Sequence, residues 1–356
     1  MKPELEKLCL DFISNRDAVG KAFSWDNSAL HTVCANIFCA HGETAEPEHL
    51  KECRGIIRES TGFLSKFRSK KVRSILAAML SLQAKPEDRM TQANEYFHLL
   101  KRQFKGSEYL VLTAFLLADL ADQVLTEEAI SRGKEIYARM NRQHRILTDK
   151  TDSVFAMLMA FSGKTADELT GETEACYQAL KKKFSSGGAQ TAAQILSMAD
   201  GTPEEKTQRV SALYDALREA EIKYGHSSEL APLAALSLAD TPLPVLTEEI
   251  KEVDEFLKTQ KGFGGSKDDD RAQRAMYAVM IVSDQYAGTE QVNITVMTNT
   301  IDMLIAKQQA SRISLFMNLL QFAVKLLPEE EEQPEKEQPV EEHPVEGQKK
   351  DDAPAK

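Results

Sequence analysis

The stretches LSMAD (residues 196–200) and LSLAD (residues 236–240) are nearly identical and lie 40 residues apart. Related stretches begin at residues 37, 80, 115, 159 and 280, so that successive starts are separated by 35–44 residues. Each one ends a short apolar segment and precedes a longer amphipathic segment. A repeat of about 40 residues with two helices in each unit is typical of an α-solenoid.

The longer segments support the same period. Their late apolar anchors are Leu99, Tyr137, Leu180, Leu217 and Leu257, spaced by 37–43 residues. Helical spacing predicts second helices near Glu87–Phe104, Glu127–Met140, Glu168–Phe184, Pro203–Tyr224 and Glu248–Gln260. Pro203 follows Thr202, while Thr126 and Thr247 each precede two glutamates, which are signals of helix starts.

These patterns predict an all-α fold, built as a right-handed α-solenoid-like array of helical hairpins of about 40 residues each. Stacking is required because one helical hairpin cannot bury both of its faces alone. The spacing is irregular and there is no strict consensus. An irregular multi-helix bundle therefore remains the alternative.

Two regions differ in composition. Residues 328–356 contain nine Glu and two Asp against four Lys, a net charge of −7 out of −11 for the whole chain. Because this tail has no apolar residue larger than Val, we expect it to be a disordered acidic tail. Residues 1–327 form the predicted all-helical repeat domain. Its last segment, Ile313–Leu327, is strongly apolar and is expected to dock on the last unit rather than on a membrane surface.

Composition also limits the class of protein. Five cysteines in 356 residues are too few for a disulfide scaffold, and most lie in apolar helical patterns. The N-terminal residues lack the pattern of a signal peptide, and no run of 18 apolar residues predicts a membrane span. We therefore expect a cytoplasmic protein with reduced thiols.

The first candidate site is a basic run of five residues that could bind an anionic partner, namely Lys66, Arg68, Lys70, Lys71 and Arg73. Its simpler interpretation is a solvated loop and helix start. A wider pattern adds weight, because second helices tend to start acidic and end basic. If these ends align in the array, they would form a basic rim that steers a charged partner.

Two further clusters are weaker candidates. His144, Thr148 and Asp152 form a candidate loop site with acid–base character, although Thr148 or Asp152 would equally cap the next helix. Cys39, His41, His49 and Cys53 are soft ligands in one predicted hairpin. They lack a Cys-x-x-Cys pair, so we expect ordinary packing, no bound metal and no cofactor.

Three stretches carry a resemblance to a known family: FRSKK at residues 67–71, GSEYL at residues 106–110 and HRILTDKTD at residues 144–152. On these stretches the chain resembles an uncharacterised bacterial family, common in Firmicutes and known only as a domain of unknown function. The resemblance covers most of residues 1–320. It implies a cytosolic helical protein and supplies no catalytic residues.

The sequence leaves the biochemical activity open but favours one class of function. We expect a non-enzymatic scaffold that binds a protein or peptide partner. One alternative is an enzyme, or a receptor for a small ligand or metal, with its site in the concave surface. A second alternative is a nucleic-acid-associated protein that uses the basic rim, although no aromatic residues are interleaved with the basic ones for base stacking.

Overall fold

The structure is a computed structural model that describes residues 1–70, 72–119, 127–148, 152–227 and 229–286. These residues form fourteen α-helices and one 3₁₀ turn, η1 (Lys66–Arg68), and contain no β-strand. The all-α prediction is confirmed. Residues 287–356, which include Ile313–Leu327 and the tail predicted at 328–356, lie outside the described residues.

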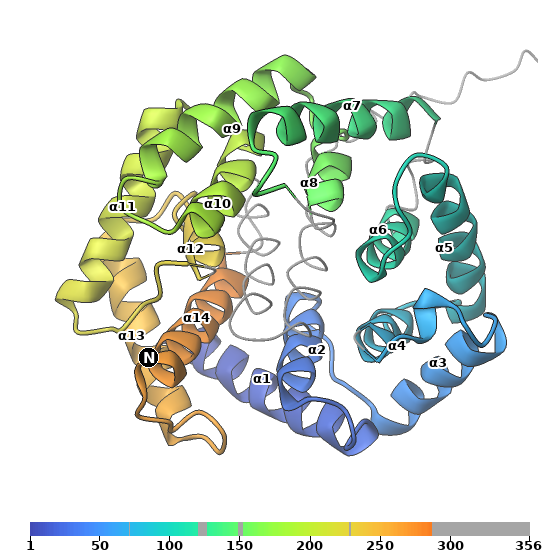
Figure 1. The fold of residues 1–356 in the computed structure, drawn as a ribbon. Coiled ribbons are helices and arrows are strands. Elements are labelled where there is room, and N and C mark those ends of the chain that lie inside the picture. The colour runs from blue at the N-terminus through green and yellow to red at the C-terminus, as the bar shows by residue number, and fades with distance from the viewer. Residues whose placement is uncertain (71, 120–126, 149–151, 228, 287–356) are drawn as a thin grey trace, which may run out of the picture.

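The helices alternate between an outer layer and an inner layer (Figure 1). The outer layer contains α1 (Pro3–Ala22), α3 (Pro47–Glu59), α5 (Pro86–Lys101), α7 (Glu127–Gln143), α9 (Ala166–Leu180), α11 (Pro203–Glu219) and α13 (Leu243–Thr259). The inner layer contains α2 (Ser28–Ala40), α4 (Arg73–Ser81), α6 (Glu108–Asp119), α8 (Asp152–Met159), α10 (Ser186–Met198), α12 (Leu230–Leu236) and α14 (Asp268–Gln285). Each inner helix packs against the outer helix that precedes it, so the predicted array of helical hairpins is confirmed.

Several helix starts follow local sequence signals. Thr202 caps α11 in a capping box with Glu205, as the sequence predicts. Thr247 does not cap a helix: it lies inside α13, and its hydroxyl donates to the carbonyl of Leu243 over 2.9 Å. The prediction is wrong because Pro244, in the first turn, allows the helix to begin earlier. Thr126 lies outside the described residues.

The recurring stretch at the ends of α8, α10 and α12 accepts hydrogen bonds from a cation of the outer layer. Arg209 of α11 donates to three carbonyls that follow α12, those of Ser237, Ala239 and Thr241. Arg132 of α7 donates in the same way to Ser162 after α8, over 3.0 Å. A cation at this position satisfies free carbonyls and complements the negative end of the helix dipole.

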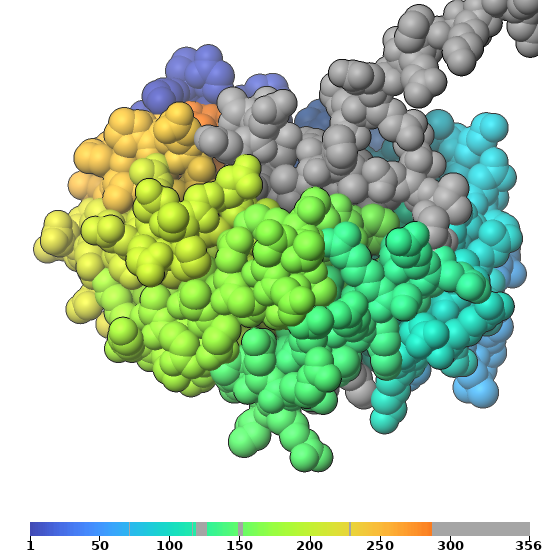
Figure 2. Space-filling view, turned by 90° about the horizontal axis from the view of Figure 1, so that it is seen from above, coloured from blue at the N-terminus to red at the C-terminus, as the bar shows by residue number. Residues whose placement is uncertain are grey.

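The array closes into a ring. Both α1 and α2 pack against α14, and α1 also contacts α13. In Figure 2 the blue N-terminal part accordingly lies beside the orange C-terminal helices. Lys2 forms an ion pair of 2.6 Å with Glu249 of α13, and Phe12 lies 6.2 Å from the ring of Tyr277 in α14. The first hairpin therefore covers the last one.

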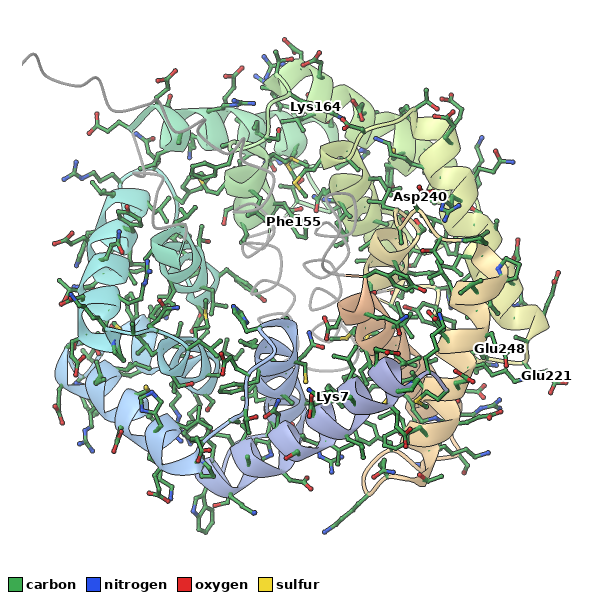
Figure 3. All side chains as sticks on the ribbon, turned by 180° about the vertical axis from the view of Figure 1, so that it is seen from behind. Lys7, Phe155, Lys164, Glu221, Asp240 and Glu248 are labelled. Carbon is green, nitrogen blue, oxygen red and sulfur yellow. The ribbon has the colours of Figure 1, made fainter. Side chains whose placement is uncertain are left out.

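The two layers differ in polarity: the outer helices expose one face to solvent, whereas the inner helices are largely buried. Phe155 of α8 points towards the middle of the ring, whereas Glu221 and Glu248 point away from it (Figure 3). Every residue from Asp152 to Met159 in α8 is buried. Among the helices of the described residues, none combines the length and the apolar character needed to cross a bilayer.

Closure of the ring can be tested at Phe12, which is fully buried between the first and last hairpins. Phe12→Ala should lower the free energy of unfolding by about 3–5 kcal/mol, because it leaves a cavity at the seam. Urea denaturation measures this difference. Leu10→Ala on the same helix is the control, since Leu10 is 54% exposed. Equal stability of both variants would show that the seam does not hold the ring together.

Candidate functional site

The connection between α3 and α4 carries the basic run and is fixed at two points. Phe67, in η1, is buried and meets the ring of Phe97 edge-on at a centroid distance of 5.4 Å. Arg68 donates from Nε to the hydroxyl of Thr61 over 3.2 Å, and its Nη2 donates to the carbonyls of Arg58 and Thr61. Phe67 and Arg68 thus anchor the middle of this connection to the helices around it.

Asp26, between α1 and α2, positions the cations at the start of α4 and on α3. Its side chain is 3% exposed and accepts from Arg73 over 2.7 Å and from the hydroxyl of Ser74. Arg54 of α3 lies 3.4 Å from the same carboxylate. Burial by itself raises the pKa of Asp26, but the hydrogen bonds from Ser74 and Arg73 and the charge of Arg54 outweigh it. The pKa therefore lies below its ordinary value of 3.8.

A cavity of about 550 Å³ opens between the end of α1, helix α3 and the start of α4. Six of the eleven described residues that line it are cationic: Lys51, Arg54, Arg58, Arg68, Lys70 and Arg73. None of these eleven residues is acidic. We call this cavity the basic pocket.

The rest of the lining is open and partly apolar. Arg54 lies over the ring of Phe23, 4.8 Å from its centroid, which holds the guanidinium at the wall. Phe63 is 85% exposed at the mouth, and its neighbour Leu64 is 91% exposed. At Gly55 a Cβ atom would meet nothing within 4 Å, so the absence of a side chain leaves this part of the pocket empty.

The chemistry of the lining is that of anion binding. Guanidinium groups carry a permanent charge and donate hydrogen bonds in a planar fork that fits carboxylates and phosphates. Burial lowers the pKa of Arg54, while Asp26 raises it and Arg73 lowers it further. One buried carboxylate thus faces two guanidinium groups, which leaves the pocket with an excess of positive charge.

The structure brings three residues of the predicted basic run to this pocket: Arg68, Lys70 and Arg73. Lys66 instead lies 3.7 Å from Glu108 at the start of α6, and Lys71 is outside the described residues. Sequence reasoning missed the three cations on α3, which are Lys51, Arg54 and Arg58. Their spacing of i, i+3 and i+7 places them on one helix face and could have revealed them.

The basic ends of the outer layer are in part neutralised between hairpins. Arg102 lies 3.9 Å from Glu127 of the next outer helix, and Lys183 lies 2.6 Å from Asp215 of α11. Arg139 of α7 binds the carboxylate of Asp167 in α9. Part of the positive charge predicted for a basic rim is therefore paired with carboxylates of the neighbouring outer helix.

The candidate loop site is divided between two environments. His144 lies 2.5 Å from the carboxylate of Glu174 in α9, and its ring is 4.4 Å from that of Tyr177. Thr148 donates to the carbonyl of Met140 over 3.3 Å. Asp152 is buried on α8 and accepts from Gln190 and Gln194 of α10. The structure thus places Asp152 in the packing between inner helices and leaves His144 with an acidic partner on the outer layer.

The Cys/His cluster is spread over two helices. Cys39 on α2 accepts from the side chain of Asn15 over 3.6 Å, while His41 contacts the carbonyl of Ile37. Cys53 and His49 on α3 lie 3.9 Å apart, and burial raises the pKa of the Cys53 thiol to about 12. No group of three or more metal-ligating side chains occurs among the described residues.

A family comparison accounts for most of the chain. The family described as a protein of unknown function, DUF4003, matches residues 15–310. The chain belongs to the DUF4003 family. The resemblance to a domain of unknown function is thereby confirmed. No curated protein and no solved structure matches the chain.

A second cavity of this DUF4003 chain lies at the seam of the ring. It has a volume of about 930 Å³ and is lined by residues of α1, α2 and α14 and of the turn after α13. Its most deeply buried cation, Arg274, is bound to Asp254 at 2.8 Å and to the carbonyl of Phe263. Asp17 and Asp270 also line this cavity, whereas no acidic residue lines the basic pocket, so the basic pocket is the better candidate in this DUF4003 protein for binding an anion.

The role of Asp26 as the anchor of the basic pocket can be tested by pH. Asp26→Asn should lower the free energy of unfolding by about 1–3 kcal/mol at pH 7, because two guanidinium groups lose their charged partner. A depressed pKa in the folded state stabilises the protein above the ordinary carboxyl pKa of 3.8, and this stabilisation is lost as the pH falls below that value.

The free energy of unfolding of the wild type should therefore exceed that of Asp26→Asn by less at pH 3 than at pH 7. Urea denaturation at both pH values measures this difference. Asp17→Asn is the control, because the side chain of Asp17 is 60% exposed. A difference that stayed constant across this range would contradict the assigned charge state of Asp26.

Proposed function

We propose that this protein is a non-enzymatic helical scaffold whose basic pocket binds an acidic segment of a partner protein. The observation that carries the proposal is the convergence of six cationic side chains from α3, from its connection to α4 and from the start of α4 around one open cavity. Groups that stay charged bind anions but do not exchange protons near neutral pH, which favours binding over acid–base catalysis. We place the protein in the cytoplasm, in keeping with its reduced, buried cysteines.

The surroundings of the pocket favour a peptide as the anion. Phe63 and Leu64 offer exposed apolar surface beside the cations, and this combination suits a chain with both acidic and apolar side chains. The net charge of the whole chain is −11, and its long-range repulsion grows with the charge of the partner, so it weighs more against a polyanion such as RNA than against a short acidic segment. Nucleic acid is therefore the second candidate, and it predicts binding that falls steeply with salt.

The proposal can be tested by placing a carboxylate in the pocket at Gly55. Gly55→Glu has room for its side chain and replaces a helical glycine, so the fold should be retained. Binding of a fluorescent peptide of alternating Glu and Leu, followed by anisotropy, should weaken by roughly tenfold or more, about 1.4 kcal/mol. The physical reason is that the carboxylate introduced at position 55 repels the glutamates of the peptide.

The chain offers a matched control. Gly171 lies on α9, away from the basic pocket, and a Cβ atom there also meets nothing within 4 Å. Gly171→Glu adds the same charge and should bind the peptide as the wild type does. Equal affinity of the two variants would remove the basic pocket from the proposal, and tighter binding of an RNA oligonucleotide than of the peptide would favour the second candidate.

A further inference from the structure

The inner helices are enclosed on both sides. In α12 every residue from Leu230 to Leu236 is buried, and in α14 every residue from Arg274 to Ser283 is buried. The outer layer can cover only one side of such a helix. A helix that is apolar and buried all round needs a second apolar surface on its other side.

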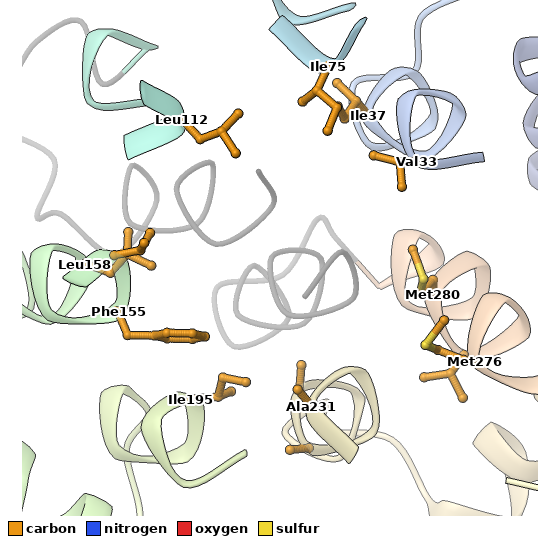
Figure 4. Packing of buried hydrophobic residues seen from close by; sticks show 14 of the residues in the cluster. Val33, Ile37, Ile75, Leu112, Phe155, Leu158, Ile195, Ala231, Met276 and Met280 are labelled. Atoms are coloured by element: carbon orange, nitrogen blue, oxygen red, sulfur yellow. The ribbon is translucent and has the colours of Figure 1, made fainter. Parts of the chain in front are cut away.

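That other side faces the middle of the ring. Figure 4 shows apolar side chains of the inner helices that point there, and each is at most 2% exposed. They include Ile75 of α4, Leu112 of α6, Phe155 of α8, Ile195 of α10 and Met280 of α14. An open, water-filled channel would leave all of these side chains exposed, at a large cost in free energy.

The sequence that follows α14 contains a stretch that is apolar enough to be buried in the middle of the ring. In Ile313–Leu327 the polar residues are Ser314, Asn318, Gln321 and Lys325. At 3.6 residues per turn these four fall within an arc of about 60°, so that a helix here would be apolar over the rest of its surface. Such a helix cannot be covered by docking on one face of a single hairpin, but a ring encloses it from several sides.

A preceding stretch has the same character. Ile294, Met297, Ile301 and Leu304 follow the spacing i, i+3, i+7 and i+10, which forms one helix face. Residues 291–327 thus hold two apolar helical patterns. A helix of 15 residues is about 22 Å long, comparable with the inner helices α10 (13 residues) and α14 (18 residues).

The position at which the described chain ends favours this occupant. Tyr286, just after α14, donates to the carboxylate of Glu249 over 2.5 Å, and Gln285 donates to the same carboxylate over 3.2 Å. These bonds fix the end of an inner-layer helix. The next residues therefore leave from the inner layer, and residues 291–327 need no long connection to reach the middle of the ring.

We infer that residues 291–327 of the same chain dock on the inward faces of the inner helices and fill the middle of the ring. Ile313–Leu327 then packs against several hairpins at once and completes the core that the inner layer leaves open. The basic pocket lies on the outer layer and its loops, so this inference does not depend on the proposed function.

Photocrosslinking of the full chain tests the inference directly. The photoreactive analogue p-benzoylphenylalanine is placed at position 316, and ¹⁴N-labelled and ¹⁵N-labelled copies are mixed before irradiation. Mass spectrometry of the peptides should find crosslinks from position 316 to inner helices such as α8 and α12, all within one isotope. The same analogue at position 338, in the acidic tail, should give no crosslinks to these helices.

The other outcomes overturn the inference. Crosslinks between the two isotopes would show that a second copy supplies the segment. Crosslinks confined to the outer helices, or none to the inner helices, would show that something else covers the inward faces.

A stability measurement adds an independent test with a matched pair of variants. Leu320→Asp places a carboxylate on the apolar side of the segment and should lower the melting temperature by roughly 5–10 °C. Asn318→Asp adds the same charge on the polar arc and should change it by about 2 °C or less. Equal shifts of the two variants would contradict docking of the apolar side.

Discussion

The structure depends on one constraint: its inner helices contain long stretches, such as Leu230–Leu236 in α12 and Asp152–Met159 in α8, in which every residue is buried and which must be covered on every side. The outer helices provide one cover by hairpin packing, as Leu217 and Leu257 do from α11 and α13. Curving the array until α1 meets α14 then turns the remaining faces towards one another (Figure 1). Closure is the geometry that lets the seven inner helices share one interior.

Cations serve two purposes in this ring, and their partners decide which. Arg209 and Arg132 donate to backbone carbonyls at the ends of inner helices. Around the basic pocket, Arg54 and Arg73 share the carboxylate of Asp26. Lys51 and Arg58 lie near the exposed acids Glu48 and Glu59, so the six cations still outnumber their acidic partners. Excess charge at an open cavity, rather than the total number of basic residues, is what makes the pocket a candidate binding site.

Much of the fold and part of the candidate site could be predicted from the sequence. The period of the LSMAD-type stretches and the caps at residues such as Thr202 are local signals, and they located α5, α7, α9 and α11 to within a few residues. The basic run was visible for the same reason. Its partners on α3 were missed because contact between residues 51–58 and 68–73 arises from packing, and Thr247 was misread because a proline nearby moved the start of its helix.

The sequence by itself determined that the chain is all helical and that apolar helical segments alternate with amphipathic ones about every 40 residues. These properties follow from helical periodicity and capping, which act over a few residues. Only the tertiary structure decided that the array closes and that Arg54, Arg73 and Asp26 meet at one pocket. Both depend on the angle between successive hairpins, which is set by the sum of many side-chain contacts and leaves no local pattern in the sequence.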